Sequence, residues 1–590
     1  MTARLARLGA LARAHRGILL IALAALFPLF GNLGAGTLWS DEADTAVFAR
    51  SILRSGVPTA WDGVTFTESD RGRRLTENLV MVGTPWVPYY LTAASLAGLG
   101  ATSFAARLPF ALAGLATLVL LYGLVLRSTG DRLAALLSSA LLLTSAQFLI
   151  YARQSRHYAL NMMLSVALLL TFTRLEKRRI DPLFIAIAVL LYHTHPLPAV
   201  VTIGVLGALT LVHPAFGAAR TGFWRSLPFV VVLTAPWALL AWRGWDENSR
   251  LLLAPSDLIP RVQQFVYEAS VALPYVGWLL LAPLAARRLS ARDRSFLVLA
   301  LALVAACVVV MSASQSTLHL WEYGLRYTSA LLPIGAAVTG LLIARATAGA
   351  RPAAVAAAAL FAFTQIPWNL ALWMLVPPKG APAEGPTQPE AALHTPMRWV
   401  DKLLRTDLLG FAHELVESSP GTDSLIVEFL RANARPGDVV VTNYAWEPLY
   451  FHTGLPQGYK VLEDYPIYAA ARAAGLPDYT FGLEQTRWLI WRAPWEDYQG
   501  YRWADVSRRL REAGATLSPV ASFRETTWEN RENVHFRRFP SLGYLYPLDV
   551  DLAARPAQVY RVDHDRASGG VPAPPASGAL RGRPYTTIGG

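Results

Sequence analysis

Two adjacent acidic residues, Asp41 and Glu42, lie a few residues beyond the first apolar run of the chain, Gly17 to Gly34. Charged side chains at a membrane boundary are costly and usually functional. A carboxylate there can accept a proton from an incoming hydroxyl group or bind a divalent ion. The pair also suits a helix start, because Ser40 is a good N-cap and acids favour the first helical turn. Local sequence therefore leaves a catalytic and a structural interpretation open.

Three arginines are candidates for binding a phosphate group. Arg153 and Arg156 lie at the outer end of a predicted membrane span and would share a helix face, and Arg326 enters a later span from the same side. Arginine matches phosphate oxygens bidentately, although it can also anchor a helix at the membrane surface. The preference of cations for the cytoplasmic side does not explain arginines on the outer side. We therefore predict that all three bind phosphate.

Further polar residues accompany these arginines. His193 and His195 flank the apex of a Pro-broken helical hairpin, where a polar apex, a substrate contact and metal ligation all stay open. The predicted substrate-contacting residues are Asp44, His157, Tyr158, His195, Glu322 and Tyr327. A divalent metal is an optional cofactor, for which Asp41, Glu42 and His195 are the candidate ligands.

Membrane helices must position these residues. Of the 590 residues, 53% are hydrophobic and 16% are charged, whereas soluble domains carry about 25% charged residues. Charge-poor stretches, each about long enough to cross a bilayer of ~30 Å, recur along the chain. The net charge of +12 comes from Arg and Lys in short loops, which membrane orientation explains without a nucleic-acid partner. The single cysteine, Cys307, precludes an internal disulfide.

About eleven crossings are predicted. They cover residues 17–35, 107–126, 133–150, 157–173, 181–193, 197–213, 226–243, 266–286, 295–313, 328–346 and 353–376. The aromatic, Pro-containing stretch 84–100 is ambiguous. All basic loops become cytoplasmic only if this stretch stays interfacial or re-entrant, and the C-terminal region then lies outside. Cleavage of the first apolar run as a signal peptide is the less favoured alternative.

We predict a polytopic α-helical membrane protein with about 11–13 transmembrane helices and a C-terminal extracytoplasmic α/β domain. The predicted parts are a membrane domain (1–376) with a first external loop (36–106), a linker (377–394), the α/β domain (395–562) and a disordered tail (563–590). In the α/β domain we expect strands at 439–442, 488–491 and 517–523 and helices at 396–417, 424–434, 445–453 and 502–513. Alternating helices and strands favour a partly parallel sheet.

Taken together, these residues resemble the GT-C superfamily of polyprenyl-phosphate-sugar glycosyltransferases. The chain is most similar to the protein O-mannosyltransferases and to the bacterial transferases that attach aminoarabinose to lipid A. The matching pieces are Trp39-x-Asp41-Glu42, Arg107-Leu108-Pro109, Tyr151-x-Arg153-x-x-Arg156-x-Tyr158, Thr194-His195-Pro196, Arg326-Tyr327 and Arg435-Pro436-Gly437-Asp438. They span most of residues 15–450, and their order makes the set more specific than any single piece.

The resemblance implies an inverting transfer in which Asp41 is the general base and Glu42 supports acceptor or metal binding. Arg153, Arg156 and Arg326 would hold the leaving phosphate, where negative charge builds up. One departure concerns the Lys-Pro-Pro-Leu motif of many bacterial members. Here Gly83-Thr84-Pro85-Trp86 stands in its place, which leaves the donor sugar open. Arg73 and Arg74 are candidates to replace the missing lysine.

The expected function is transfer of a monosaccharide from a polyprenyl-phosphate donor to a protein, lipid A or an envelope glycan. The expected location is the outer face of the bacterial inner membrane, with membrane lipid as a further partner. A transporter or flippase for a lipid-linked precursor is the main alternative, and it would place polar groups near the bilayer midplane. A non-catalytic membrane anchor is a third alternative, which eleven crossings disfavour.

Overall fold

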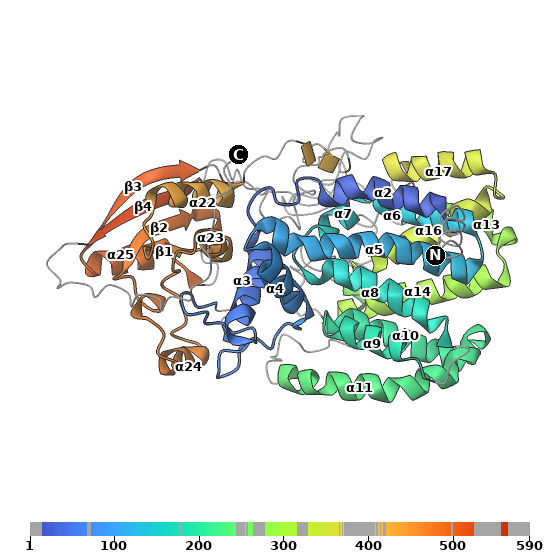
Figure 1. The fold of residues 1–590 in the computed structure, drawn as a ribbon, viewed down its shortest axis with the longest axis horizontal. Helices are drawn as coiled ribbons and strands as arrows, with labels where there is room; N and C mark the ends of the chain where they lie inside the picture. Colours follow the sequence, from blue (N-terminus) through green and yellow to red (C-terminus); the bar gives the residue numbers. More distant parts are fainter. Residues whose placement is uncertain are drawn as a thin grey trace, which may run out of the picture.

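The computed structural model describes residues 15–67, 72–175, 180–242, 278–314, 329–364, 421–496, 500–523 and 556–564, with Glu525 and scattered residues within 254–262, 366–370 and 408–416. A bundle of helices fills one side, two helices cross one end of it, and a domain containing a sheet lies beyond them (Figure 1). The bundle contains α2 (Arg16–Phe30), α5 (Ser103–Thr129), α6 (Arg132–Leu143), α7 (Ala146–Ala152), α8 (His157–Phe172), α9 (Pro182–Tyr192), α10 (Pro196–Val212), α11 (Arg220–Trp242), α13 (Trp278–Ala285), α14 (Ala291–Ser314), α16 (Leu331–Ala346) and α17 (Arg351–Phe363).

Every predicted span overlaps a helix of this bundle, although the span 266–286 is described only from Trp278 onward. Within the described residues, three segments are long and apolar enough to cross a membrane: Ser103–Thr129, Pro214–Ala241 and Ala291–Ala313. Helices α6 and α7 pass the same test together, as one span bent by 71°. The bend follows from Ser145, whose hydroxyl group accepts the Phe148 N–H and starts a new helix.

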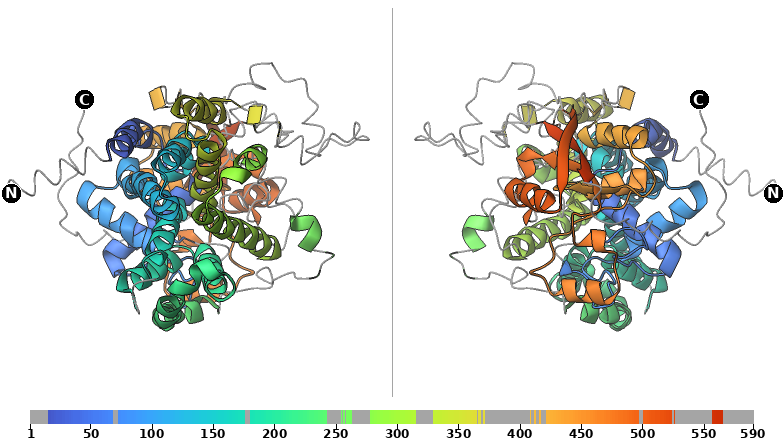
Figure 2. Two further views of the ribbon diagram at one scale, coloured as in Figure 1. Left: turned by 90° about the vertical axis from the view of Figure 1, so that its right-hand side faces the viewer. Right: turned by 90° about the vertical axis from the view of Figure 1, so that its left-hand side faces the viewer.

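Apolar side chains lie on the outside of the bundle as well as in its core. Leu23 of α2 is 64% exposed and Leu239 of α11 is 71% exposed. Inside, α6 and α16 approach closely, and a Cβ atom on Gly340 would lie 2.6 Å from the Ser138 backbone nitrogen. Small residues at close contacts and apolar residues facing outward are typical of helices packed in lipid. The predicted polytopic membrane architecture is therefore confirmed. Figure 2 shows the molecule from the free end of the bundle (left) and from the end that carries the sheet (right).

Two short helices cross one end of the bundle: α3 (Ser40–Ser55) and α4 (Val87–Leu99). Helix α3 ends at Gly56, whose left-handed backbone (φ 81°) lets its N–H bond the Ile52 carbonyl. Helix α4 lies next to α3 at this end of the bundle (Figure 1). An interfacial position of the segment 84–100 stays a prediction.

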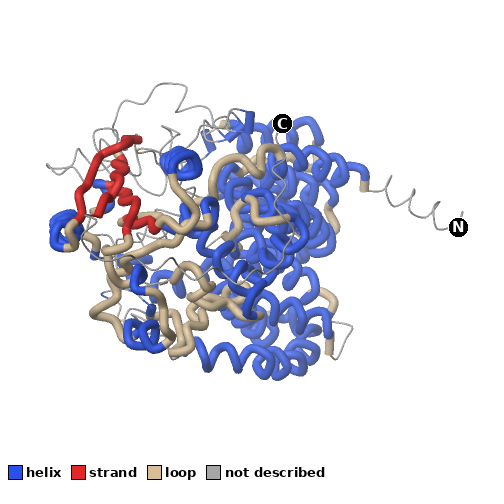
Figure 3. Tube along the Cα trace, turned by 60° about the vertical axis from the view of Figure 1, so that its left-hand side comes forward, coloured by secondary structure: helices blue, strands red, loops and turns tan. Residues whose placement is uncertain are grey.

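The C-terminal domain contains α22 (Thr422–Asn433), β1 (Val439–Thr442), α23 (Trp446–Thr453), α24 (Ile467–Ala473), β2 (Thr486–Arg492), α25 (Trp503–Glu512), β3 (Ala515–Phe523) and β4 (Ala557–His564). The strand order is β1-β2-β4-β3, with β1 parallel to β2 and β4 antiparallel to both its neighbours. Figure 3 shows these strands gathered on one side of the domain.

The predicted strands and the helices from 424 onward are found within about two residues of their expected ends. Helix α24 and strand β4 were not predicted. Because β4 extends to His564, the sheet continues past the predicted domain end at 562. Most of the predicted helix 396–417, the linker 377–394 and residues 565–590 lie outside the described residues.

Candidate active site at the start of α3

Glu42 is fully buried and held on both carboxylate oxygens. Arg107 Nε lies 2.9 Å from Oε1 and Nη2 lies 2.8 Å from Oε2, while the Ser155 backbone N–H donates to Oε1 at 2.9 Å. The Trp39 N–H also bonds Oε2, which makes Glu42 part of a capping box. The guanidinium of Arg107 also donates hydrogen bonds to the carbonyl groups of Leu33, Ala35 and Thr37. This geometry gives Glu42 a structural task that differs from the predicted support of acceptor or metal.

Asp41 lies on the open side of the same turn, and its side chain is 29% exposed. Arg156 Nη2 donates to Asp41 Oδ2 at 3.1 Å, and Nη1 contacts the Asp41 carbonyl oxygen and the Thr45 hydroxyl group. The same guanidinium lies 3.7 Å from Asp44 Oδ2. The buried Nε of Arg156 has no hydrogen-bond partner in the described part of the chain. Adjacent acids in one turn therefore have different surroundings, one enclosed and one accessible.

Arg153 and Arg156 do not share a helix face, so that prediction is wrong. Both lie in the irregular stretch between α7 and α8, where the helical spacing is interrupted. Arg153 is buried and donates from Nη1 to the Pro28 carbonyl at 3.0 Å, a group that the end of α2 leaves without a helical partner. Arg156 reaches the turn that carries Asp41.

Burial, rather than the surrounding charge, favours protonation of Asp44. Burial raises the pKa of Asp44 to about 6, against the lowering effect of Arg156, and the Asp41 charge adds to the rise. Arg74 also lowers the pKa of Asp44, so its positive charge acts on this turn. Arg74 is one of the two residues expected to replace the missing lysine. The site therefore combines two aspartates with at least two cations.

The predicted aromatic and histidine contacts form a second group beside the arginines. The His157 ring lies 4.5 Å from Tyr158 and 4.7 Å from His195. Tyr158 is fully buried against Tyr151. His195 caps α10 by accepting the Leu197 N–H. His157 directly follows Arg156 in the chain, so this group forms one wall near the site.

Three predicted residues, Glu322, Arg326 and Tyr327, lie outside the described residues. Within the residues that are described, no group of three or more His, Cys, Asp and Glu side chains has the arrangement of a metal site.

Sequence reasoning did not find the partners that come from distant parts of the chain. Arg107 was noted only as part of a motif, although a buried arginine at a span end requires an acidic partner. Glu447 of α23 accepts a hydrogen bond from Ser40 Oγ at its Oε2, at 3.1 Å. No pattern in the sequence indicates this contact. Glu447 lies 407 positions from Ser40 and belongs to a different domain.

Comparisons with known proteins agree with this architecture. Residues 83–241 match the family described as dolichyl-phosphate-mannose-protein mannosyltransferase. The fold is similar to that of ArnT from Cupriavidus metallidurans bound to undecaprenyl phosphate, with a TM-score of 0.53, 17% identity, and coverage of 85% of this chain and 96% of that one. The apo state of the same protein gives a TM-score of 0.51 at 14% identity, covering 93% and 98%. No curated protein sequence matches the chain.

Over residues 83–241 the chain is similar to the mannosyltransferase family, and over most of its length it is similar in fold to ArnT.

Proposed function

We propose that the protein is an inverting glycosyltransferase that uses a polyprenyl-phosphate monosaccharide and acts on the outer face of the bacterial inner membrane. The observation that carries the proposal is the contrast within one turn: Glu42 is enclosed by Arg107, whereas Asp41 stays accessible beside Arg156. Transfer from a lipid phosphate needs a carboxylate that can take the proton of the acceptor and a guanidinium that can bind the phosphate. The acceptor is a hydroxyl group of a protein, of lipid A or of an envelope glycan.

In this mechanism Asp41 accepts the proton of the acceptor hydroxyl group as its oxygen forms a bond to the anomeric carbon. The bond from that carbon to the phosphate oxygen breaks at the same time, and its electron pair leaves with the polyprenyl phosphate. Because attack and departure occur on opposite faces, the anomeric configuration inverts. The guanidinium of Arg156 stabilises the negative charge that develops on the phosphate.

The ion pair with Arg156 holds the Asp41 carboxylate before the donor binds. The incoming phosphate then competes for the guanidinium, and its Nε, which has no hydrogen-bond partner among the described residues, supplies one further donor. Loss of the ion pair would make the Asp41 carboxylate more basic when the acceptor arrives. Arg153 and Arg326 remain proposed phosphate ligands, and Glu42 becomes, in this proposal, the residue that fixes the turn.

The test is transfer from a panel of radiolabelled polyprenyl-phosphate hexoses and pentoses in membranes that contain the full-length protein. We expect Asp41→Asn to lower transfer by about 10²-fold or more, with unchanged expression and thermal stability. Asp438→Asn, at a carboxylate in the C-terminal domain that bonds Trp488 Nε1, is the control. Full activity of Asp41→Asn would refute the proposed base, and no transfer by the unmutated protein from any donor would favour a transporter.

A further inference from the structure

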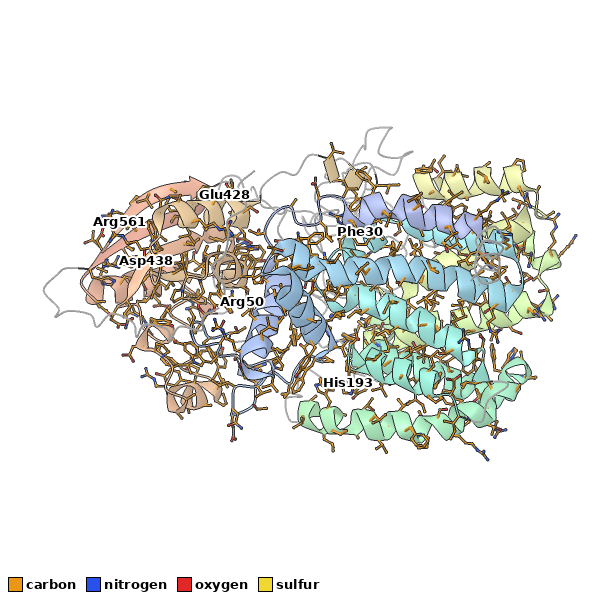
Figure 4. The ribbon with its side chains drawn as sticks, in the orientation of Figure 1. Phe30, Arg50, His193, Glu428, Asp438 and Arg561 are labelled. Atoms are coloured by element: carbon orange, nitrogen blue, oxygen red, sulfur yellow. The ribbon has the colours of Figure 1, made fainter. Side chains whose placement is uncertain are left out.

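The C-terminal domain contacts α3 along its length. At the N-terminal side, the Leu38 N–H donates to His452 Nε2 at 3.0 Å, and further along Arg50 lies 4.9 Å from the centre of the Tyr450 ring. Figure 4 shows Arg50 on the side of α3 that faces the domain. Leu38, Phe48, Trp446, Tyr450 and Phe451 belong to one buried cluster. The domain is therefore packed on the helix that carries the candidate base.

Within this interface, Glu447 contacts the turn that carries Asp41. It lies in the first turn of α23, and its Oε2 accepts the Ser40 Oγ hydrogen bond at 3.1 Å. Ser40 is the first residue of α3 and the direct neighbour of Asp41. The charged groups that act on Glu447 are Asp44 on α3 and Lys460, whose Nζ lies 3.6 Å from the centre of the Trp446 ring.

Burial raises the pKa of Glu447 to about 8, and the Asp44 charge contributes to the rise. Asp44, with a pKa of about 6, loses its proton first. At neutral pH Asp44 on α3 is thus mostly ionised, and the carboxyl group of Glu447 on α23 is mostly uncharged. Ionisation of Glu447 would place a second negative charge opposite Asp44, with Lys460 nearby to offset part of it.

We propose that Glu447 is a positioning residue for the transfer reaction, contributed by the C-terminal domain, which holds the first turn of α3 through its hydrogen bond with Ser40. The inference rests on the proposed role of Asp41. Repulsion between ionised Glu447 and Asp44 weakens the contact between α23 and α3, and the orientation of Asp41 toward the acceptor is lost with it. In this proposal the C-terminal domain contributes to the transfer reaction by orienting Asp41.

The decisive variant is Glu447→Gln, because glutamine keeps the size and the oxygen acceptor for Ser40 but does not ionise. Glu428→Gln is the matched control, since Glu428 is an exposed glutamate of the same domain, on α22, and is labelled in Figure 4. Hydrogen exchange of α3 is measured by mass spectrometry on the full-length protein in detergent, at pH 7 and 9, with correction for intrinsic exchange.

We expect α3 to exchange about fivefold or more faster at pH 9 than at pH 7 in the unmutated protein and in Glu428→Gln, and equally at both pH values in Glu447→Gln. Equal pH dependence in all three proteins would overturn the proposal.

A second measurement follows transfer between pH 6 and 10, with the polyprenyl-phosphate sugar that proves active in the first assay. The unmutated protein should lose activity above pH 8, and Glu447→Gln should keep it. A retained alkaline loss in Glu447→Gln, with Asp41→Asn inactive, would refute the positioning role alone. An active Asp41→Asn would refute the proposed function itself.

Discussion

The two ends of the bundle each carry an arginine between two aspartates. At one end Arg156 contacts Asp41 at 3.1 Å and Asp44 at 3.7 Å, and its Nε lacks a partner within the described residues. At the other end Arg345 bonds both oxygens of Asp293, at 2.8 and 3.1 Å, and also Asp131.

The difference lies in how completely the acids are bonded. Asp293 is fully enclosed and accepts the Ser290 N–H, while Asp131 caps α6 through the Ala134 N–H. Asp41 and Asp44 keep part of their surface accessible. At the Arg345 end one aspartate is thus fully enclosed, whereas at the Arg156 end both aspartates keep part of their surface accessible. These accessible acids, together with an arginine Nε that has no hydrogen-bond partner among the described residues, distinguish the candidate site.

The largest effect on stability should come from the buried ion pair of Glu42 and Arg107, which lies next to the accessible pair of Asp41 and Arg156. Arg107→Met leaves the Glu42 carboxylate buried without its cation, and we expect the free energy of unfolding to fall by about 3–5 kcal/mol. Thermal unfolding in detergent, followed by tryptophan fluorescence, measures this change. The double variant Glu42→Met with Arg107→Met should recover much of the loss. A stable Arg107→Met single variant would show that Glu42 does not depend on this pair.

A smaller effect should distinguish Arg345 from Arg156. Replacement of Arg345 should mainly lower stability, and replacement of Arg156 should mainly lower the transfer rate. Arg345→Met should lower the free energy of unfolding by about 2–4 kcal/mol and leave the transfer rate of the folded protein unchanged. Arg156→Met should cost about 1 kcal/mol but reduce transfer about 10²-fold.

The control for this pair is Arg508→Ala, which removes an exposed arginine between Asp505 and Glu512 and should change neither quantity measurably. If Arg156→Met lost stability and kept its transfer rate, the two ends would be equivalent and the comparison would fail.

The smallest effect concerns the pH dependence of stability. Because the pKa of Asp44 is raised in the folded protein, from 3.8 to about 6, its contribution to stability is present below pH 4 and is lost as the pH rises to about 6. Asp44→Asn does not ionise, so it should exceed the unmutated protein in stability at pH 7 by on the order of 1 kcal/mol and equal it at pH 4. Melting temperatures across this pH range test the difference, and a constant offset at all pH values would contradict it.

Much of the architecture could be predicted because lipid demands long apolar helices, which leave a direct pattern in the sequence. The turn at Asp41 was found because two acids follow the first span. The separate tasks of Asp41 and Glu42 could not be predicted, since the partners that distinguish these neighbouring acids come from distant parts of the chain. Arg107, for example, lies 65 positions after Glu42. The contact of Ser40 with Glu447 joins two domains, and strand β4 has no turn signal that ties it to β2. Such long-range pairings depend on the folded chain.

Strand β4 has a consequence for biosynthesis. It is the last described strand in the sequence, yet it occupies an interior position between β2 and β3. Until residues 557–564 have been made, β2 and β3 have no common neighbour, and the sheet behind α23 cannot close. Helix α3 is synthesised more than 500 residues before that strand. Termination before Ala557 would therefore release a chain that has α3 and α23 but lacks the strand that joins β2 to β3 behind them.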